Sequence, residues 1–266
     1  MTPCDDLLIG GTLSGSGLTG GVSIQDSRIF VSDWSGLLGK VGYDRQLIAV
    51  AGRAGGYVVG DGVPDVRFLT LNLGVTRWAD SGQGSLTEAS EAEQVDANTD
   101  LILGYLGDPD GFYLERVLAD GTSRFVHAYA IDPFPFQQRT WRRMSVPLRS
   151  DTPYWRQGGT ESTDTLSGSD TLTNAGNARL YDGVLVFPST GATIASTALG
   201  WSATTAATSA AVTVDLGART VKRGGTDVDG LLTLTNGVWP FFEPGANAVT
   251  VTGSAITATW RTPWQT

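Results

Sequence analysis

Hydrophobic and polar residues alternate along most of this chain with a period of two, which is the pattern of β-strands that bury one face. The alternation is clear in residues 67–75 (RFLTLNLGV) and 212–216 (VTVDL), and glycine-rich turns separate such runs. Asp120-Gly121, which stands between two alternating runs, is a strong signal for a β-hairpin. The pattern therefore predicts a mainly β fold. The other strands expected in the first 150 residues are 27–33, 46–52, 57–60, 112–118, 123–131 and a strand pair across 137–148.

One helix is expected, from Leu86 to Tyr105. Ser85 and Glu88 form a capping box at its start, and acidic residues crowd its first turns, where the helix dipole favours negative charge. The predicted apolar stripe consists of Ala89, Ala92, Val95, Ile102 and Tyr105. Three residues interrupt this stripe and leave an early end to the helix open: Asn98, Thr99 and Gly104.

The last thirty residues predict the end of a β-sandwich or barrel. A turn at Pro244–Asn247 precedes two short alternating runs, 249–252 and 256–261. Gly253-Ser254 between the runs suits a two-residue type II′ turn, so we expect a closing hairpin here. Trp260 is expected to pack into the core.

The chain is expected to form two domains. Residues 1–156 form the first, residues 157–170 (QGGTESTDTLSGSD) read as a polar linker, and residues 171–266 form an all-β second domain. Residues 1–25 are rich in Gly, Ser and Thr, and an arm, a loop and an irregular edge strand all remain open for them.

Composition narrows the function. The formal net charge is −9, which disfavours general nucleic-acid binding through phosphates. A single cysteine, Cys4, excludes an internal disulfide. No apolar run approaches the ~18 residues of a membrane-spanning helix, and the first residues lack the pattern of a signal peptide. We therefore expect a protein without a membrane span.

The inventory for catalysis is poor. His127 is the only histidine, and its place inside a predicted strand favours an ordinary strand residue over a member of a catalytic triad. Residues 15–20 match G-x-G-x-x-G, but a strand pattern follows them where a dinucleotide site needs a helix. The chain has too few His and Cys residues for a zinc site. Residues 108–111 and 227–230 resemble fragments of calcium loops and are expected to be turns. We expect no enzymatic activity, no cofactor and no metal.

A group of arginines concentrates positive charge in this acidic chain. It has two interpretations: a solvated strand face, or a contact between subunits in which guanidinium groups meet acids on a neighbour. The candidate interface residues are Arg139, Arg142, Arg143, Arg149 and Arg156.

Taken in order, several motifs give the chain its resemblance to the siphophage distal tail protein family, which is often labelled minor tail protein in actinobacterial phages. The first domain contributes a strand, a helix and a hairpin, and then a strand that leads into a Pro-aromatic signature. These motifs are Arg67–Val75, the following helix, Asp120-Gly121, 146–155 (VPLRSDTPYW), 173–178 (TNAGNA), Trp239, 242–247 (FEPGAN), Val251 and Trp260. The chain departs from the family pattern at Thr152, which separates Asp151 from Pro153, and at Phe242-Glu243, where the family often has Leu-Lys or Leu-Arg.

This resemblance implies a structural protein of the virion, assembled in the host cytoplasm and located at the tail tip. It implies a split-barrel, tail-tube-like N-terminal domain with one helix, followed by a galectin-like β-sandwich. Six copies would form a ring at the distal end of a long non-contractile tail. The implied partners are the tail tube protein, the tail-tip hub protein and the tape measure protein, and receptor-binding proteins are further candidates.

A second function remains open from the residues alone. The predicted β-sandwich, together with the eight Trp and 27 acidic residues of the whole chain, is compatible with a carbohydrate-binding or carbohydrate-active protein. Glycoside hydrolysis needs only two suitably spaced carboxylates. Packing in the core or at an interface is the commoner fate of Trp.

Overall fold

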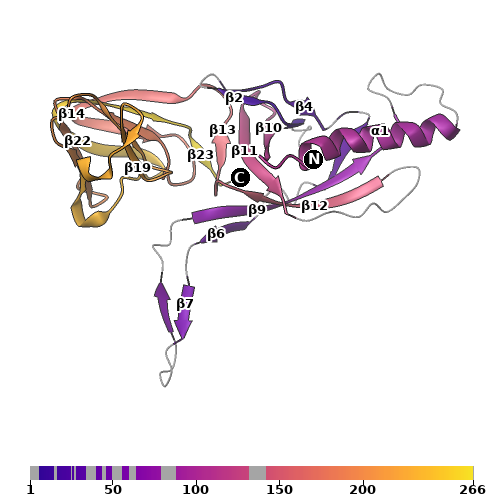
Figure 1. The fold of residues 1–266 in the computed structure, drawn as a ribbon, viewed down its shortest axis with the longest axis horizontal. Helices are drawn as coiled ribbons and strands as arrows, with labels where there is room; N and C mark the ends of the chain where they lie inside the picture. Colours follow the sequence, from indigo (N-terminus) through magenta and orange to yellow (C-terminus); the bar gives the residue numbers. More distant parts are fainter. Residues whose placement is uncertain are drawn as a thin grey trace. The chain divides into compact units, whose positions relative to one another are not determined.

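The chain divides into two compact units, 1–159 and 160–265, in a computed structural model (Figure 1). Both are built from antiparallel strands, and the described residues contain one α-helix, which confirms the mainly β fold. The structure describes residues 6–14, 17–24, 26, 28–33, 40–43, 46–49, 56–59, 64–78, 88–131 and 142–265.

The first unit contains a sheet of order β4-β1-β10-β11-β12-β9-β5, in which β6 also pairs with β9 and β13 with β11. Two small hairpins, β2–β3 and β7–β8, lie outside it. The strands are β1 (Asp6–Ile9), β2 (Thr12–Ser14), β3 (Gly17–Thr19), β4 (Val22–Ser23), β5 (Ile29–Asp33), β6 (Lys40–Tyr43), β7 (Gln46–Ala49), β8 (Gly56–Val59), β9 (Pro64–Val75), β10 (Phe112–Val117), β11 (Ser123–Ala130), β12 (Arg142–Ser150) and β13 (Trp155–Gln157).

One face of this sheet is apolar because every second residue of its long strands is hydrophobic. Leu71 of β9 lies opposite Val146 of β12, and both are completely buried. Leu7 and Ile9 of β1 are buried as well. Of the possibilities open for residues 1–25, the structure therefore shows a strand paired with β10 for residues 6–9, not a free arm. The expected hairpin at Asp120-Gly121 is confirmed by β10 and β11.

The expected helix is confirmed as α1 (Glu88–Leu106), which lies along β9 and β12 (Figure 1). Ser85 of the predicted capping box lies outside the described residues. Val95, Ile102 and Leu106 on its inner side are buried. The helix does not end early at Asn98 and Thr99, because both are buried and hydrogen-bonded within the unit.

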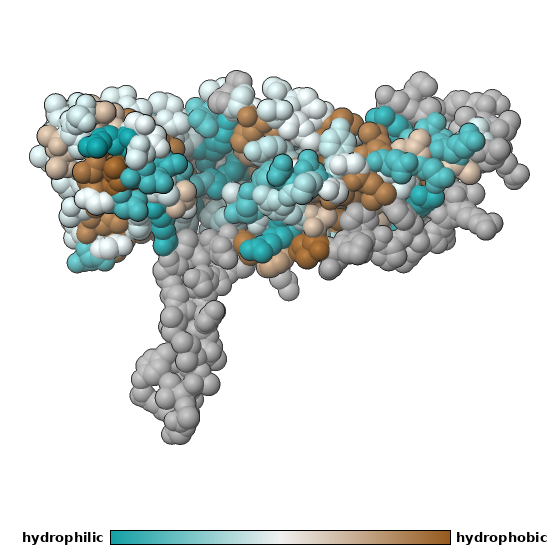
Figure 2. Space-filling view, in the orientation of Figure 1, coloured by the Kyte–Doolittle hydropathy of each residue, from teal (hydrophilic) through white to brown (hydrophobic). Residues whose placement is uncertain are grey.

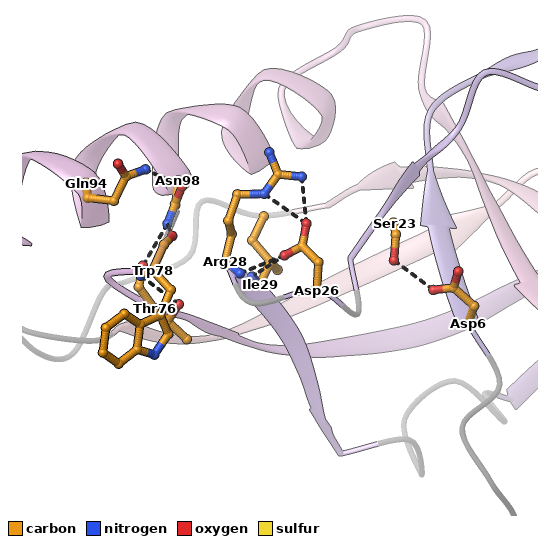
Figure 3. A network of polar contacts seen from close by, with 9 residues as sticks. All are labelled: Asp6, Ser23, Asp26, Arg28, Ile29, Thr76, Trp78, Gln94 and Asn98. Carbon is orange, nitrogen blue, oxygen red and sulfur yellow. Dashed lines mark hydrogen bonds and ion pairs between the residues drawn. The ribbon is translucent and has the colours of Figure 1, made fainter. Parts of the chain in front are cut away.

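Asn98 joins α1 to the segment that follows β9 (Figure 3). Its Nδ2 donates to the carbonyl oxygens of Thr76 at 2.8 Å and Trp78 at 2.9 Å. Its Oδ1 accepts a hydrogen bond from Gln94 Nε2 at 3.0 Å. Burial of an amide is costly unless its donors and acceptors are satisfied, and here both are.

Asp26 shapes the turn before β5 (Figure 3). Its carboxylate accepts from the backbone N–H of Arg28 at 2.7 Å and of Ile29 at 3.0 Å. The Arg28 guanidinium closes an ion pair with the same carboxylate at 2.6 Å. A short acidic side chain that bonds the backbone two residues on is a common way to fix a turn.

The second unit contains a sheet of order β20-β19-β18-β15-β22-β16-β17-β21, with β14 paired to β22. Its elements are β14 (Ser162–Asn174), β15 (Val184–Phe187), β16 (Ala192–Ser196), β17 (Trp201–Thr205), β18 (Val212–Asp215), β19 (Thr220–Arg223), β20 (Thr226–Asp227), η2 (Asp229–Leu231), β21 (Leu232–Leu234), η3 (Thr235–Gly237), β22 (Gly245–Trp260) and β23 (Pro263–Trp264).

The predicted closing hairpin is wrong, because β22 runs through Gly253-Ser254 as one strand. Along one edge it pairs with β14, whose register shifts between Leu166 and Gly168. Along the other edge its first half pairs with β16 and its second half with β15. Gly253, with φ of 98°, lies in a bulge. Gly-Ser permits a turn, but each half of β22 finds other partners, so the chain bends instead of reversing.

The predicted linker at 157–170 is also wrong for residues 162–170, which belong to β14. The segment looked like a linker because most of its outward positions are Ser or Thr. Only Leu166 and Leu172 of this strand are apolar and buried. Threonine suits a strand with one exposed face, and pairing with β22 supplies the backbone hydrogen bonds that a linker would lack.

One hydrophobic cluster fills the second unit and receives residues from both halves of β22. Trp260 is 7% exposed within it, which confirms its expected core position. Trp201 Nε1 donates to the Phe241 carbonyl oxygen at 2.9 Å, so its polar atom is satisfied as well. Its ring meets Phe242 edge-on at 5.5 Å, a favourable aromatic geometry.

Two buried asparagines explain the TNAGNA and FEPGAN motifs. Asn247 Oδ1 accepts from the Glu243 N–H at 2.8 Å, and its Nδ2 donates to the carbonyl oxygens of Glu243 at 2.8 Å and Gly245 at 2.9 Å. Asn174 likewise accepts from the Gly176 N–H at 3.0 Å. Because Asn174 lies opposite Gly245 across β14 and β22, the two motifs are neighbours in the fold.

We predict that Asn98→Ala destabilises the first unit by about 2 kcal/mol, because it leaves the Thr76 and Trp78 carbonyl groups without their donor. Guanidinium unfolding of the full chain measures the change. Asp110→Ala, an exposed change in the turn before β10, is the matched control and should stay within about 0.5 kcal/mol of the unchanged chain. Equal stability of the two variants would refute the assigned role of Asn98.

For the second unit, Asn247→Ala should lower the free energy of unfolding by about 2–3 kcal/mol. The N–H of Glu243 and the carbonyl groups of Glu243 and Gly245 all lose the side chain that they share as a hydrogen-bond partner. Thermal unfolding gives the shift, and hydrogen exchange at Glu243 should speed up in the variant. Thr250→Ala, an exposed change on the same strand, serves as the control. Unchanged exchange at Glu243 would contradict the prediction.

Candidate subunit-contact surface

The structure separates the five candidate arginines. Arg142 points to the helix side of the sheet, where its Nη1 donates to Thr99 Oγ1 at 3.1 Å and its Nη2 pairs with Asp96. Arg143 and Arg149 point to the opposite side and are exposed. Arg156 lies on β13 opposite Phe125 and is half-buried. The remaining candidate, Arg139, lies outside the described residues.

An aromatic ladder runs along β10 and β11 on the side of the sheet that faces away from α1. The Tyr113 ring centroid lies 4.8 Å from that of His127, which in turn lies 5.0 Å from that of Tyr129. His127 Nδ1 is 2.8 Å from Asp151 Oδ2. His127 is therefore a strand residue held between two tyrosines and a carboxylate.

The ladder continues across the next two strands. Tyr129 of β11 pairs in register with Arg149 of β12, which pairs with Phe68 of β9. Phe68 and nearby Ile131 are each 47% exposed. In Figure 2 brown, hydrophobic atoms reach the surface where β9, β11 and β12 meet. We call the five residues of this band the outer strip: Tyr113, His127, Tyr129, Arg149 and Phe68.

The surroundings of Tyr129 disfavour ionisation of its hydroxyl and raise its pKa. Burial raises the pKa of the Tyr129 hydroxyl, and the nearby carboxylates of Asp151 and Asp110 raise it further. At neutral pH the hydroxyl is a hydrogen-bond donor on the strand next to Arg149.

Sequence reasoning missed a buried cation near the start of β9. Arg67 is 2% exposed, and burial lowers the pKa of its guanidinium to about 10, so it still carries its charge at neutral pH. Its Nη1 donates to the Pro153 carbonyl oxygen at 3.3 Å. This bond ties β9 to the SDTPYW segment that follows β12. The signal available was the inward parity of Arg67 with Leu69 and Leu71.

The other face of the unit carries the opposite charge. All ionisable residues of α1 except Tyr105 are acidic, and none is basic. Glu91 pairs with Arg77 at 2.8 Å and Asp96 with Arg142, both within the unit. Four exposed residues at helical spacing remain, and we call them the outer helix stripe: Glu93, Ala97, Asp100 and Gly104.

Metal binding and a membrane-spanning helix find no support among the described residues. Within the part of the chain that the structure describes, no group of His, Cys, Asp and Glu could hold a metal ion. The 108–111 segment is a turn, in which Asp108 Oδ1 accepts from the Asp110 N–H at 2.9 Å. No described helix is long and apolar enough to cross a membrane.

The aromatic residues of the second unit are buried or half-buried. Trp201 and Trp260 are buried, and Trp239 and Trp264 are half-buried. Phe241, partly buried, lies 5.9 Å from the Tyr181 ring and beneath the Arg179 guanidinium at 5.5 Å. Arg179 also pairs with Glu243 at 2.6 Å. These contacts hold Phe241 against Tyr181 and Arg179.

Comparison with known proteins shows the fold. No family model and no curated protein matches the chain. Among solved structures it is similar to the Dit protein of phage SPP1, described as a paradigm of the hub adsorption apparatus in phages that infect Gram-positive bacteria. That similarity has a TM-score of 0.58 at 14% identity and covers 97% of this chain and 99% of that one. The phage P2 baseplate in its activated conformation with Ca matches with a TM-score of 0.42 at 9% identity, over 97% and 98% of the two chains. The chain therefore shares the fold of the SPP1 protein along nearly its whole length.

Proposed function

We propose that this chain is a structural protein of a phage tail tip, without enzymatic activity. Six copies form a ring at the distal end of a long non-contractile tail. The ring joins the tail tube protein to the tail-tip hub protein and leaves a channel for the tape measure protein and DNA. The observation that carries this proposal is the fold shared with the SPP1 hub protein across 97% of the chain.

One further observation supports it. The ordered motifs that resemble the distal tail family, TNAGNA and FEPGAN, are neighbours in the second unit and build its fold through Asn174 and Asn247. The proposed ring contacts involve the outward arginines Arg143 and Arg149, with Arg156 nearby on β13.

A carbohydrate-binding role of the sandwich is the alternative function. It rests on the β-sandwich shape alone, and shape does not establish ligand binding. A glycan array and a turnover assay on cell-wall polysaccharide distinguish it from an assembly role. Binding or turnover by the isolated full chain would favour the alternative.

Assembly of the purified chain tests the proposal. We expect sedimentation and electron microscopy to show a six-fold ring, alone or when the tail tube protein is added. A chain that remains monomeric and binds no tail tube or hub protein would refute it.

A further inference from the structure

The outer strip and the outer helix stripe lie on opposite faces of the first unit. Residues 142 and 149 of β12 differ in parity, so Arg149 points away from the face on which Arg142 bonds to α1. A single copy therefore cannot bring the strip and the stripe together. Any contact between them joins two molecules.

The strip has the composition of a protein-binding surface. Tyrosine and arginine are enriched among the residues that dominate binding energy at interfaces. Arg149 is exposed between Tyr129 and Phe68, and among the described residues it has no ion-pair partner. Phe68, at 47% exposed, places a large apolar ring next to this charge.

The stripe is complementary in charge and shape. Glu93 and Asp100 are seven residues apart on one side of α1 and, within the described part of the chain, have no ion-pair partner. Ala97 and Gly104 alternate with them. Small side chains let another surface approach the helix backbone closely, so the Phe68 ring can pack between the two carboxylates while Arg149 reaches one of them.

We propose that the outer strip of one copy binds the outer helix stripe of a second copy, which makes this contact the joint between neighbouring subunits. The inference rests on the ring assembly proposed above and specifies its two faces. Because each copy offers both surfaces, the contact is head-to-tail and repeats from copy to copy. Such contacts produce either a closed ring or an open filament, depending on the rotation between neighbours.

Two charge variants of the full chain test the contact. Arg149→Glu reverses the charge of the outer strip and leaves the outer helix stripe unchanged. The double variant Glu93→Lys/Asp100→Lys reverses the charge of the outer helix stripe and leaves the outer strip unchanged. Each alone should weaken self-association at least about thirtyfold in sedimentation velocity at low salt, where exposed charges are least screened. Mixed in equal amounts they should assemble again, because every neighbouring pair then has opposite charges. An alternating arrangement closes in a ring of six.

Lys222→Glu, an exposed change on β19 of the second unit, is the matched control and should assemble like the unchanged chain.

If the unchanged chain forms rings and Arg149→Glu does too, this contact is wrong while the proposed function stands. If the two variants fail alone and also when mixed, the pairing of these surfaces is likewise refuted. If the unchanged chain never assembles, even with the tail tube protein, the proposed function itself fails. If the unchanged chain binds a glycan, and Phe68→Ala loses that binding but still assembles, the outer strip is a sugar-binding surface. That result would overturn the proposed contact.

Discussion

Each unit is organised by the backbone hydrogen bonds of one long antiparallel strand pair. In the first unit β9 pairs with β12 along one edge and with β5 and β6 in succession along the other. In the second, β22 pairs with β14 along one edge and with β16 and β15 along the other. Shorter strands take their register from the long pair. Since a slip by one residue turns every side chain to the wrong face, the core of each unit depends on that pairing.

Strand parity also determines which charges remain exposed at the surface of the first unit. On β12 the inward Arg142 is used by α1, and the outward Arg149 lies beside exposed aromatic rings. On α1 the same division holds: Asp96 is used inside the unit, while Asp100 is exposed. An acidic protein can in this way expose the guanidinium of Arg149 on one side of the sheet and the carboxylate of Asp100 on the helix.

Much of this fold could be predicted from local patterns. The alternation at 67–75, the helix and the Asp120-Gly121 hairpin each depend on neighbouring residues, and each is present. The prediction of a hairpin at Gly253-Ser254 is wrong because the same dipeptide suits either a turn or a bulge. Which of the two forms depends on pairing with strands that are distant in the sequence. The prediction of a linker at 162–170 is wrong for the same reason, since the residues that pair with this segment lie about eighty to a hundred positions later in the chain.

The candidate surface shows the same limit. The cluster of arginines was visible in the sequence, and so was the parity that separates Arg142 from Arg149. What the sequence could not provide was the neighbourhood of Arg149, because Phe68 and Tyr129 come from two other strands. The sequence around Asn98 predicts a weak point in the helix, because the neighbouring residues do not reveal that its side chain binds the Thr76 carbonyl group.

The pairing of β14 with β22 has a consequence for how the protein is made. These strands are the first and last long strands of the second unit, so its central ladder joins segments far apart in sequence. During synthesis β14 leaves the ribosome well before its partner exists, and its edge stays open while roughly seventy intervening residues are added. Such non-local pairing makes folding slow. The outward face of β14 is rich in Ser and Thr, which is why the sequence resembles a linker. These polar side chains keep the unpaired strand soluble and disfavour aggregation before β22 is made.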